Sequence, residues 1–98
     1  MGEAHKLGEE YQVNIPIQMM AVTDTSGTMN PMRFRLETVD HEIKTVNIKN
    51  IVSRSEKNYV GIREKQYICI VEMGDTCSTV EIRYSVDTQK WRVYQFLS

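Results

Sequence analysis

Residues 65–86 read KQYICIVEMGDTCSTVEIRYSV. After Gly74-Asp75, apolar and polar side chains alternate, and before it Tyr67 and Cys69 are two positions apart on one face, which is the pattern of strands with a buried face. A glycine in the first position of a two-residue loop is typical of a type II′ turn. This stretch therefore predicts an antiparallel hairpin, whose register places two opposed pairs on one core face: Cys69 with Val80, and Tyr67 with Ile82.

The same alternation continues on both sides of this hairpin and predicts four further strands. Counting the hairpin, we expect strands over residues 13–23, 32–39, 43–53, 65–73, 76–86 and 91–97. Short connections between consecutive strands make an antiparallel meander. So many strands in so short a chain can bury one face only by curling, so the predicted fold is all-β, a small barrel or a strongly bent sheet.

The remaining segments are predicted from their lack of alternation. Residues 1–12 are polar and are expected to form a flexible tail, which leaves residues 13–98 as a single domain. Residues 54–64 are expected to be the longest irregular stretch. Pro16 is expected at an edge or a strand start, because proline cannot donate a ladder hydrogen bond.

Two further hairpins have predicted registers. A connection at 40–42 pairs Leu36 with Val46 and Phe34 with Ile48, and a turn at 87–90 sets Trp91 opposite Val86 and Val93 opposite Tyr84. Alternation then predicts a shared interior of seven residues: Phe34, Val46, Cys69, Ile82, Tyr84, Trp91 and Val93.

Composition narrows the class of protein. Ninety-eight residues suit one domain, and the net charge of −1 with a pI near 6.1 opposes a dedicated nucleic-acid binder, whose domain pI usually exceeds about 9. No apolar run approaches the roughly 20 residues that a membrane helix needs, and the N-terminus lacks the pattern of a signal peptide. We expect a cytoplasmic protein with no membrane association.

No motif for catalysis, phosphate binding or metal coordination is present in the sequence. The two histidines, His5 and His41, lie in the predicted tail and at a hairpin tip. Cys69 and Cys77 fall on opposite faces of the predicted sheet, so we expect two free thiols. The sequence favours a non-enzymatic protein without cofactor or metal.

The outward face of the last three predicted strands is not uniformly polar. Four large apolar or aromatic side chains surround two arginines there, and the set is Ile68, Ile70, Tyr94 and Phe96 with Arg83 and Arg92. Other parts of the chain or a second copy of it could cover this face. Tyrosine, phenylalanine and arginine are also the residues that anchor protein interfaces. The leading hypothesis is an interaction module that binds a protein partner, or its own twin as a homodimer, through this face.

Two alternatives stay open. A separate basic column on the second and third predicted strands, Arg33, Arg35 and Lys49, could act together with Arg83, Arg92 and Tyr94 to bind single-stranded nucleic acid by charge and stacking. A barrel whose methionines line a soft pocket could instead bind a small ligand.

Several short motifs resemble those of a known group of proteins. They are Pro31-Met32-Arg33-Phe34-Arg35, Tyr67-Ile68-Cys69, Glu81-Ile82-Arg83-Tyr84, Asp87-Thr88 and Lys90-Trp91-Arg92-Val93. Over residues 13–97 the chain resembles short uncharacterised bacterial all-β proteins. These are in turn similar to a small β domain found on or beside some Y-family (translesion) DNA polymerases. The resemblance implies an accessory or binding role near DNA repair and carries over no catalytic residues.

Overall fold

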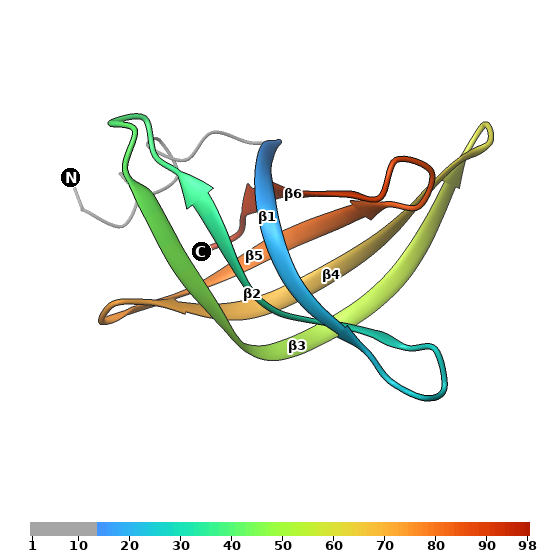
Figure 1. The fold of residues 1–98 in the computed structure, drawn as a ribbon, viewed down its shortest axis with the longest axis horizontal. Coiled ribbons are helices and arrows are strands. Elements are labelled where there is room, and N and C mark those ends of the chain that lie inside the picture. The colour runs from blue at the N-terminus through green and yellow to red at the C-terminus, as the bar shows by residue number, and fades with distance from the viewer. Residues whose placement is uncertain (1–13) are drawn as a thin grey trace.

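A computed structural model describes residues 14–98, and its six strands are β1 (Ile15–Thr23), β2 (Met29–Glu37), β3 (Ile43–Tyr59), β4 (Ile62–Met73), β5 (Thr76–Ser85) and β6 (Lys90–Phe96). Each strand pairs antiparallel with its neighbours in chain order, and β6 returns to β1, so the sheet closes into a barrel (Figure 1). The predicted all-β meander is confirmed. The predicted tail at 1–12 lies outside the described residues, which contain no helix able to cross a membrane.

The barrel interior is filled by side chains rather than hollow, as expected for a barrel of few strands. Its buried apolar residues are Phe34, Leu36, Val46, Tyr67, Cys69, Val71, Val80, Ile82 and Val93. Tyr84 and Trp91 pack against this cluster, with ring centroids 4.7 Å apart. All seven residues predicted to share the interior lie in the core or against it.

The β4–β5 hairpin has the predicted register and turn. Cys69 lies opposite Val80, and the loop consists of Gly74 and Asp75 alone. Gly74 has φ of +62° while Asp75 is not in the left-handed region, which is the combination of a type II′ turn.

The prediction of an irregular segment at 54–64 is wrong. β3 runs to Tyr59 and β4 begins at Ile62, so these residues form a regular hairpin with Val60-Gly61 as its turn. Every residue of β3 from Val52 onward is exposed, and so are Ile62 and Arg63. A strand that faces solvent on both sides needs no alternation, so the sequence carried no period-two signal here.

Val60 occupies a strained backbone position at the tip of this hairpin. Its φ is +49° and that of Gly61 is +86°, the type I′ combination that asparagine and glycine prefer. A β-branched side chain in the left-handed region is an outlier, and Val60 is fully exposed, so no packing compensates. We expect Val60→Asn to raise the free energy of unfolding by about 1 kcal/mol in urea denaturation. Val60→Thr keeps a β-branched side chain and should not raise the free energy of unfolding. Equal stability of the two variants would contradict this explanation.

The other two predicted registers are each wrong by two residues. The β2–β3 connection spans residues 38–42, with His41 at φ +65°, so Phe34 pairs with Val46. In the β5–β6 turn Gln89 also has a positive φ, and Trp91 lies opposite Tyr84. Because a shift of two residues preserves side-chain direction, the predicted core faces survive both errors.

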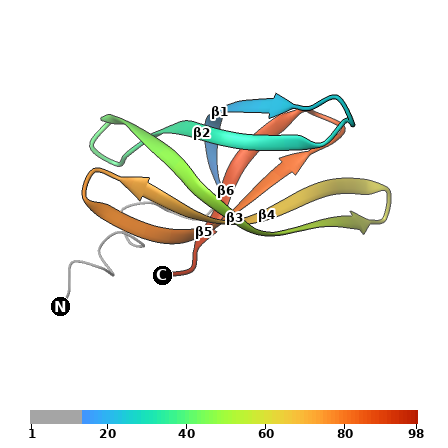
Figure 2. The ribbon, with the colours of Figure 1, turned by 90° about the horizontal axis from the view of Figure 1, so that it is seen from below.

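Bulges bend the strands so that the sheet can close. The ladders place extra residues at Met32 on β2, at Lys49 and Val52 on β3, and at Tyr94 on β6. β3 pairs with β2 only over its first five residues, Ile43 to Asn47, and then curves away. The β1–β2 and β3–β4 hairpins consequently project at the same end of the barrel (Figure 2). Pro16, the second residue of β1, is one of only three β1 residues that pair with β6.

Candidate functional site

The predicted partner face lies on the outside of β4, β5 and β6, and Phe96 is not part of it. Phe96 pairs with Val80 and packs against the core. The reason is the bulge at Tyr94, which adds one residue to β6 and reverses the alternation beyond it. The prediction that Phe96 accompanies Tyr94 outward is therefore wrong. The other five residues keep their outward side, with Ile68 and Ile70 half-buried.

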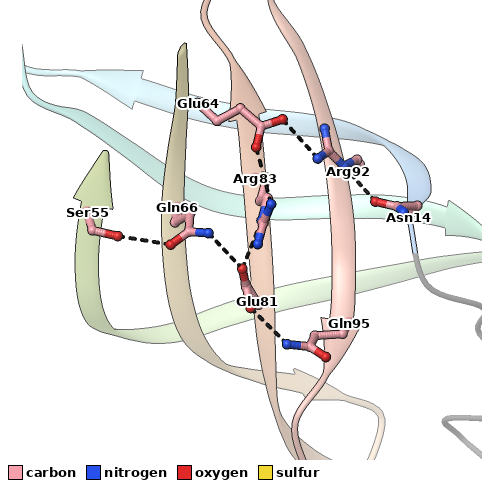
Figure 3. Close-up of polar contacts among 8 residues, drawn as sticks. All are labelled: Asn14, Ser55, Glu64, Gln66, Glu81, Arg83, Arg92 and Gln95. Carbon is pink, nitrogen blue, oxygen red and sulfur yellow. Dashed lines mark hydrogen bonds and ion pairs between the residues drawn. The ribbon is translucent and has the colours of Figure 1, made fainter. Parts of the chain in front are cut away.

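A connected network of polar side chains crosses this face (Figure 3). Glu81 is 7% exposed and lies at its centre. Its carboxylate accepts hydrogen bonds from Arg83 Nε at 2.9 Å, from Gln95 Nε2 at 3.0 Å and from Gln66 Nε2 at 3.1 Å. The Gln66 side chain accepts a further hydrogen bond from Ser55 on β3. The network thus spans four adjacent strands.

A second buried carboxylate continues the network toward β1. Glu64 Oε1 lies 3.3 Å from the Arg83 guanidinium, and Glu64 Oε2 lies 2.9 Å from that of Arg92. Arg92 Nε also donates to Asn14 Oδ1 at 2.8 Å. Two arginines and two glutamates therefore balance one another's charge. Such fully hydrogen-bonded networks fix the geometry of the strands that they join.

Tyr94 covers Arg83 from outside. The guanidinium carbon of Arg83 lies 3.5 Å from the centroid of the Tyr94 ring, which is a close cation–π contact. Burial by itself lowers the pKa of Arg83, but the hydrogen bond and charge of Glu81, with smaller contributions from Tyr94 and Glu64, raise the pKa above its ordinary value. Arg83 and Arg92 are therefore paired with Glu81 and Glu64 within the fold.

The five basic residues of the predicted nucleic-acid surface do not form one surface. Arg33 and Arg35 lie on β2, among outward residues of β1 and β3, while Arg83 and Arg92 lie on β5 and β6. Lys49 is exposed at a bulge of β3. Arg33 and Arg35 are exposed and form no ion pair with any other residue of the described 14–98 range.

A hollow of about 490 Å³ surrounds these two arginines, and we call it the arginine groove. Met20 pairs with Arg33 across the β1–β2 ladder, and Arg35 pairs with Gln18 on one side and Thr45 on the other. Met20 is 52% exposed. The full lining is Gln18, Met19, Met20, Arg33, Phe34, Arg35 and Thr45. The groove thus combines a flexible apolar side chain with two cations that have no carboxylate partner within residues 14–98.

Neither thiol takes part in a disulfide. Cys69 is buried and Cys77 is exposed, which confirms the predicted placement on opposite faces. Burial raises the pKa of the Cys69 thiol to about 11, so it remains protonated near neutral pH. His41 Nδ1 lies 2.8 Å from Glu37 in an exposed contact. Within residues 14–98, no three histidine, cysteine, aspartate or glutamate side chains are placed to hold one metal ion.

Comparisons with known proteins found no matching family model, no similar curated protein and no similar solved structure. The resemblance to short bacterial proteins and to a β domain near translesion polymerases therefore stays a prediction.

The carboxylates of the network are structural elements that the sequence alone did not reveal. Glu64 lies in the segment expected to be irregular, and Glu81 has the alternation of an ordinary solvated position. A signal for the bulges was present on β3. Ile48 and Ile51 both pack against the core although they are three residues apart, and that spacing breaks a period of two.

Proposed function

We propose that the protein is a non-enzymatic interaction module that binds an acidic segment of a protein partner in the arginine groove. The observation that supports this is the pair Arg33 and Arg35, both exposed and without a carboxylate partner among the described residues. A guanidinium presents a planar fork of donors that matches a carboxylate. The exposed Met20 beside them suits apolar side chains of varied shape.

The proposed face differs from the one that the sequence favoured. On β4 to β6, Arg83 and Arg92 are paired with Glu64 and Glu81, and Phe96 faces the core. That face lacks the free arginines and the second aromatic anchor on which the earlier hypothesis relied. Action in the cytoplasm and an accessory role near DNA repair belong to this proposal as predictions.

Single-stranded nucleic acid is the second candidate for the same groove, because arginine also binds phosphate. Nucleic-acid grooves of this kind usually add aromatic rings on which bases stack. Phe34 is the only aromatic residue that lines the groove within the described chain, and it is 1% exposed. A protein segment is therefore favoured. The small-ligand alternative is weakened because nine buried apolar side chains occupy the barrel interior.

The proposal predicts that charge reversal at Arg35 weakens binding of an acidic peptide. Arg35→Glu should weaken binding of a fluorescein-labelled peptide of glutamate and leucine by about tenfold, since it removes a charge-assisted hydrogen-bond donor and adds repulsion. Fluorescence anisotropy at low ionic strength measures the affinity.

Lys90→Glu is the matched control, because this substitution reverses the charge of an exposed residue on β6, away from the groove. A labelled single-stranded oligonucleotide forms the second arm. Tighter binding of the oligonucleotide than of the peptide, with the same loss in Arg35→Glu, would favour the nucleic-acid candidate. Equal peptide binding by wild type, Arg35→Glu and Lys90→Glu would reject the groove as the site.

A further inference from the structure

The half of β3 beyond Asn47 has a strand partner on one side only. β4 pairs with β3 as far as Tyr59, whereas β2 leaves β3 after Asn47. In the part of the chain that the structure describes, no strand pairs with the other side of β3 from Ile48 to Tyr59. The closed barrel therefore retains an open strand edge on the β3–β4 hairpin, which projects in Figure 2.

The backbone groups that face this open side can be assigned from the turn. Tyr59 and Ile62 flank a two-residue loop, so they exchange hydrogen bonds with each other, and bonded and non-bonded pairs alternate from there. Asn58 and Glu56 then direct their N–H and C=O groups away from β4. A separate contact agrees: the Arg63 carbonyl, opposite Asn58, accepts a hydrogen bond from Val86 N at 3.1 Å and so points toward β5.

Bulges, one feature that hinders strand addition, occur in only part of this edge, whereas the charged residues Arg54, Glu56 and Lys57, another such feature, lie in the rest of it. The bulges at Lys49 and Val52 disrupt the segment from Ile48 to Ser53. From Ser53 to Tyr59 the pairing with β4 is regular, and the sequence there contains no proline. We call residues 53–59 the open edge. Its outward N–H and C=O groups match those of an extended peptide, which is how many domains capture a partner strand.

A groove of about 300 Å³ runs beside the open edge, between it and the β1–β2 turn. Arg54 closes its inner end by donating hydrogen bonds to the Met29 carbonyl at 2.9 Å and to Asn30 Oδ1 at 2.6 Å. Lys65 and Glu56 also line this groove. Two cations against one carboxylate give it a net positive charge, which complements an acidic side chain on the occupant.

We infer that the open edge binds an extended segment of another polypeptide by strand addition at Glu56 and Asn58, with an acidic side chain of that segment facing the groove. This site shares no lining residue with the arginine groove and does not depend on it. The added strand pairs with the outward backbone groups of Glu56 and Asn58, while Arg54 prevents it from extending toward β2.

The test is an NMR titration of the ¹⁵N-labelled full chain with a peptide of alternating valine and glutamate. When peptide is added up to a concentration of about 1 mM, the amide chemical shifts of Glu56 and Asn58 should change. The hydrogen exchange of these two amides should also become slower. The same peptide with its alternate backbone nitrogens methylated keeps every side chain but loses the donors, so it should not bind. A peptide of alternating valine and lysine should bind at least about tenfold more weakly.

Glu56→Pro removes one outward N–H and should weaken binding by about tenfold, whereas Glu56→Ala removes the same carboxylate but keeps the N–H and should not. Equal binding of the methylated and unmethylated peptides would overturn strand addition without requiring any variant to fold. If light scattering instead shows a dimer that Glu56→Pro dissociates, the occupant is a second copy, and the assignment to another polypeptide is wrong.

Discussion

Replacing Phe34 with alanine is expected to lower the free energy of unfolding by about 4 kcal/mol, the usual range for a fully buried aromatic residue. Phe34 is 1% exposed and lies at the centre of the cluster opposite Val46. Truncation removes its transfer free energy and leaves a cavity that the closed barrel cannot collapse. This is a large share of the roughly 5–15 kcal/mol that stabilises a typical domain.

Urea denaturation followed by tryptophan fluorescence measures this loss, because Trp91 packs against the same core. Phe34→Leu keeps most of the volume and should lose about 1.5 kcal/mol, so it reports on the site even if the alanine variant unfolds. Met32→Ala is the control, since Met32 is a neighbour on β2 with 49% of its surface exposed. Similar losses at the two positions would contradict the placement of the core.

Replacing Arg83 with alanine is expected to destabilise the fold by about 3 kcal/mol. The substitution leaves the carboxylates of Glu81 and Glu64 near each other, with only 10% and 9% of their side chains exposed. Glu81 would keep only the two glutamine amides as partners. The loss should appear as a lower urea midpoint with an unchanged slope.

Two comparisons separate the network from a general effect of losing an arginine. Arg83→Lys keeps the charge but loses the planar guanidinium and its stacking on Tyr94. The stability of this variant should therefore lie between those of wild type and Arg83→Ala. Arg35→Ala removes an exposed arginine without an ion pair in the described range and should change stability by less than about 0.5 kcal/mol. An Arg83→Ala loss as small as that of Arg35→Ala would show that the network contributes no net stability.

Alternation predicts the elements in which one face is buried and the other is wet. In the β4–β5 hairpin every second residue from Tyr67 to Val71 and from Ser78 to Ile82 is buried, so its strands, turn and register follow from the sequence even though its other face is half-buried rather than fully exposed. The hairpin at the end of β3 does not follow from the sequence, because both of its faces meet solvent and no pattern is needed. The alternation of side chains therefore reflects burial, and it reveals a strand only where one face of that strand is buried.

The candidate sites depend on details that local pattern cannot supply. A single bulge at Tyr94 moves Phe96 to the core, and its cause is the curvature of the whole barrel. The sequence could name Arg33, Arg35, Arg83 and Arg92 but could not divide them into arginines that pair with carboxylates and arginines that do not. That division depends on Glu64 lying beside Arg83, 19 residues away, which requires the exact strand register.

The ladder between β1 and β6 holds only Ile15, Pro16 and Ile17, and one of these lacks an N–H to donate. This β1–β6 seam, the ladder that closes the barrel, joins residues from opposite ends of the domain. Asn14 and Arg92, which form a hydrogen bond beside it, are 78 positions apart. Closing so long a loop carries the largest entropy loss of any contact in the meander, while every other ladder grows from a local turn. The seam is thus the contact for which loop length opposes formation most.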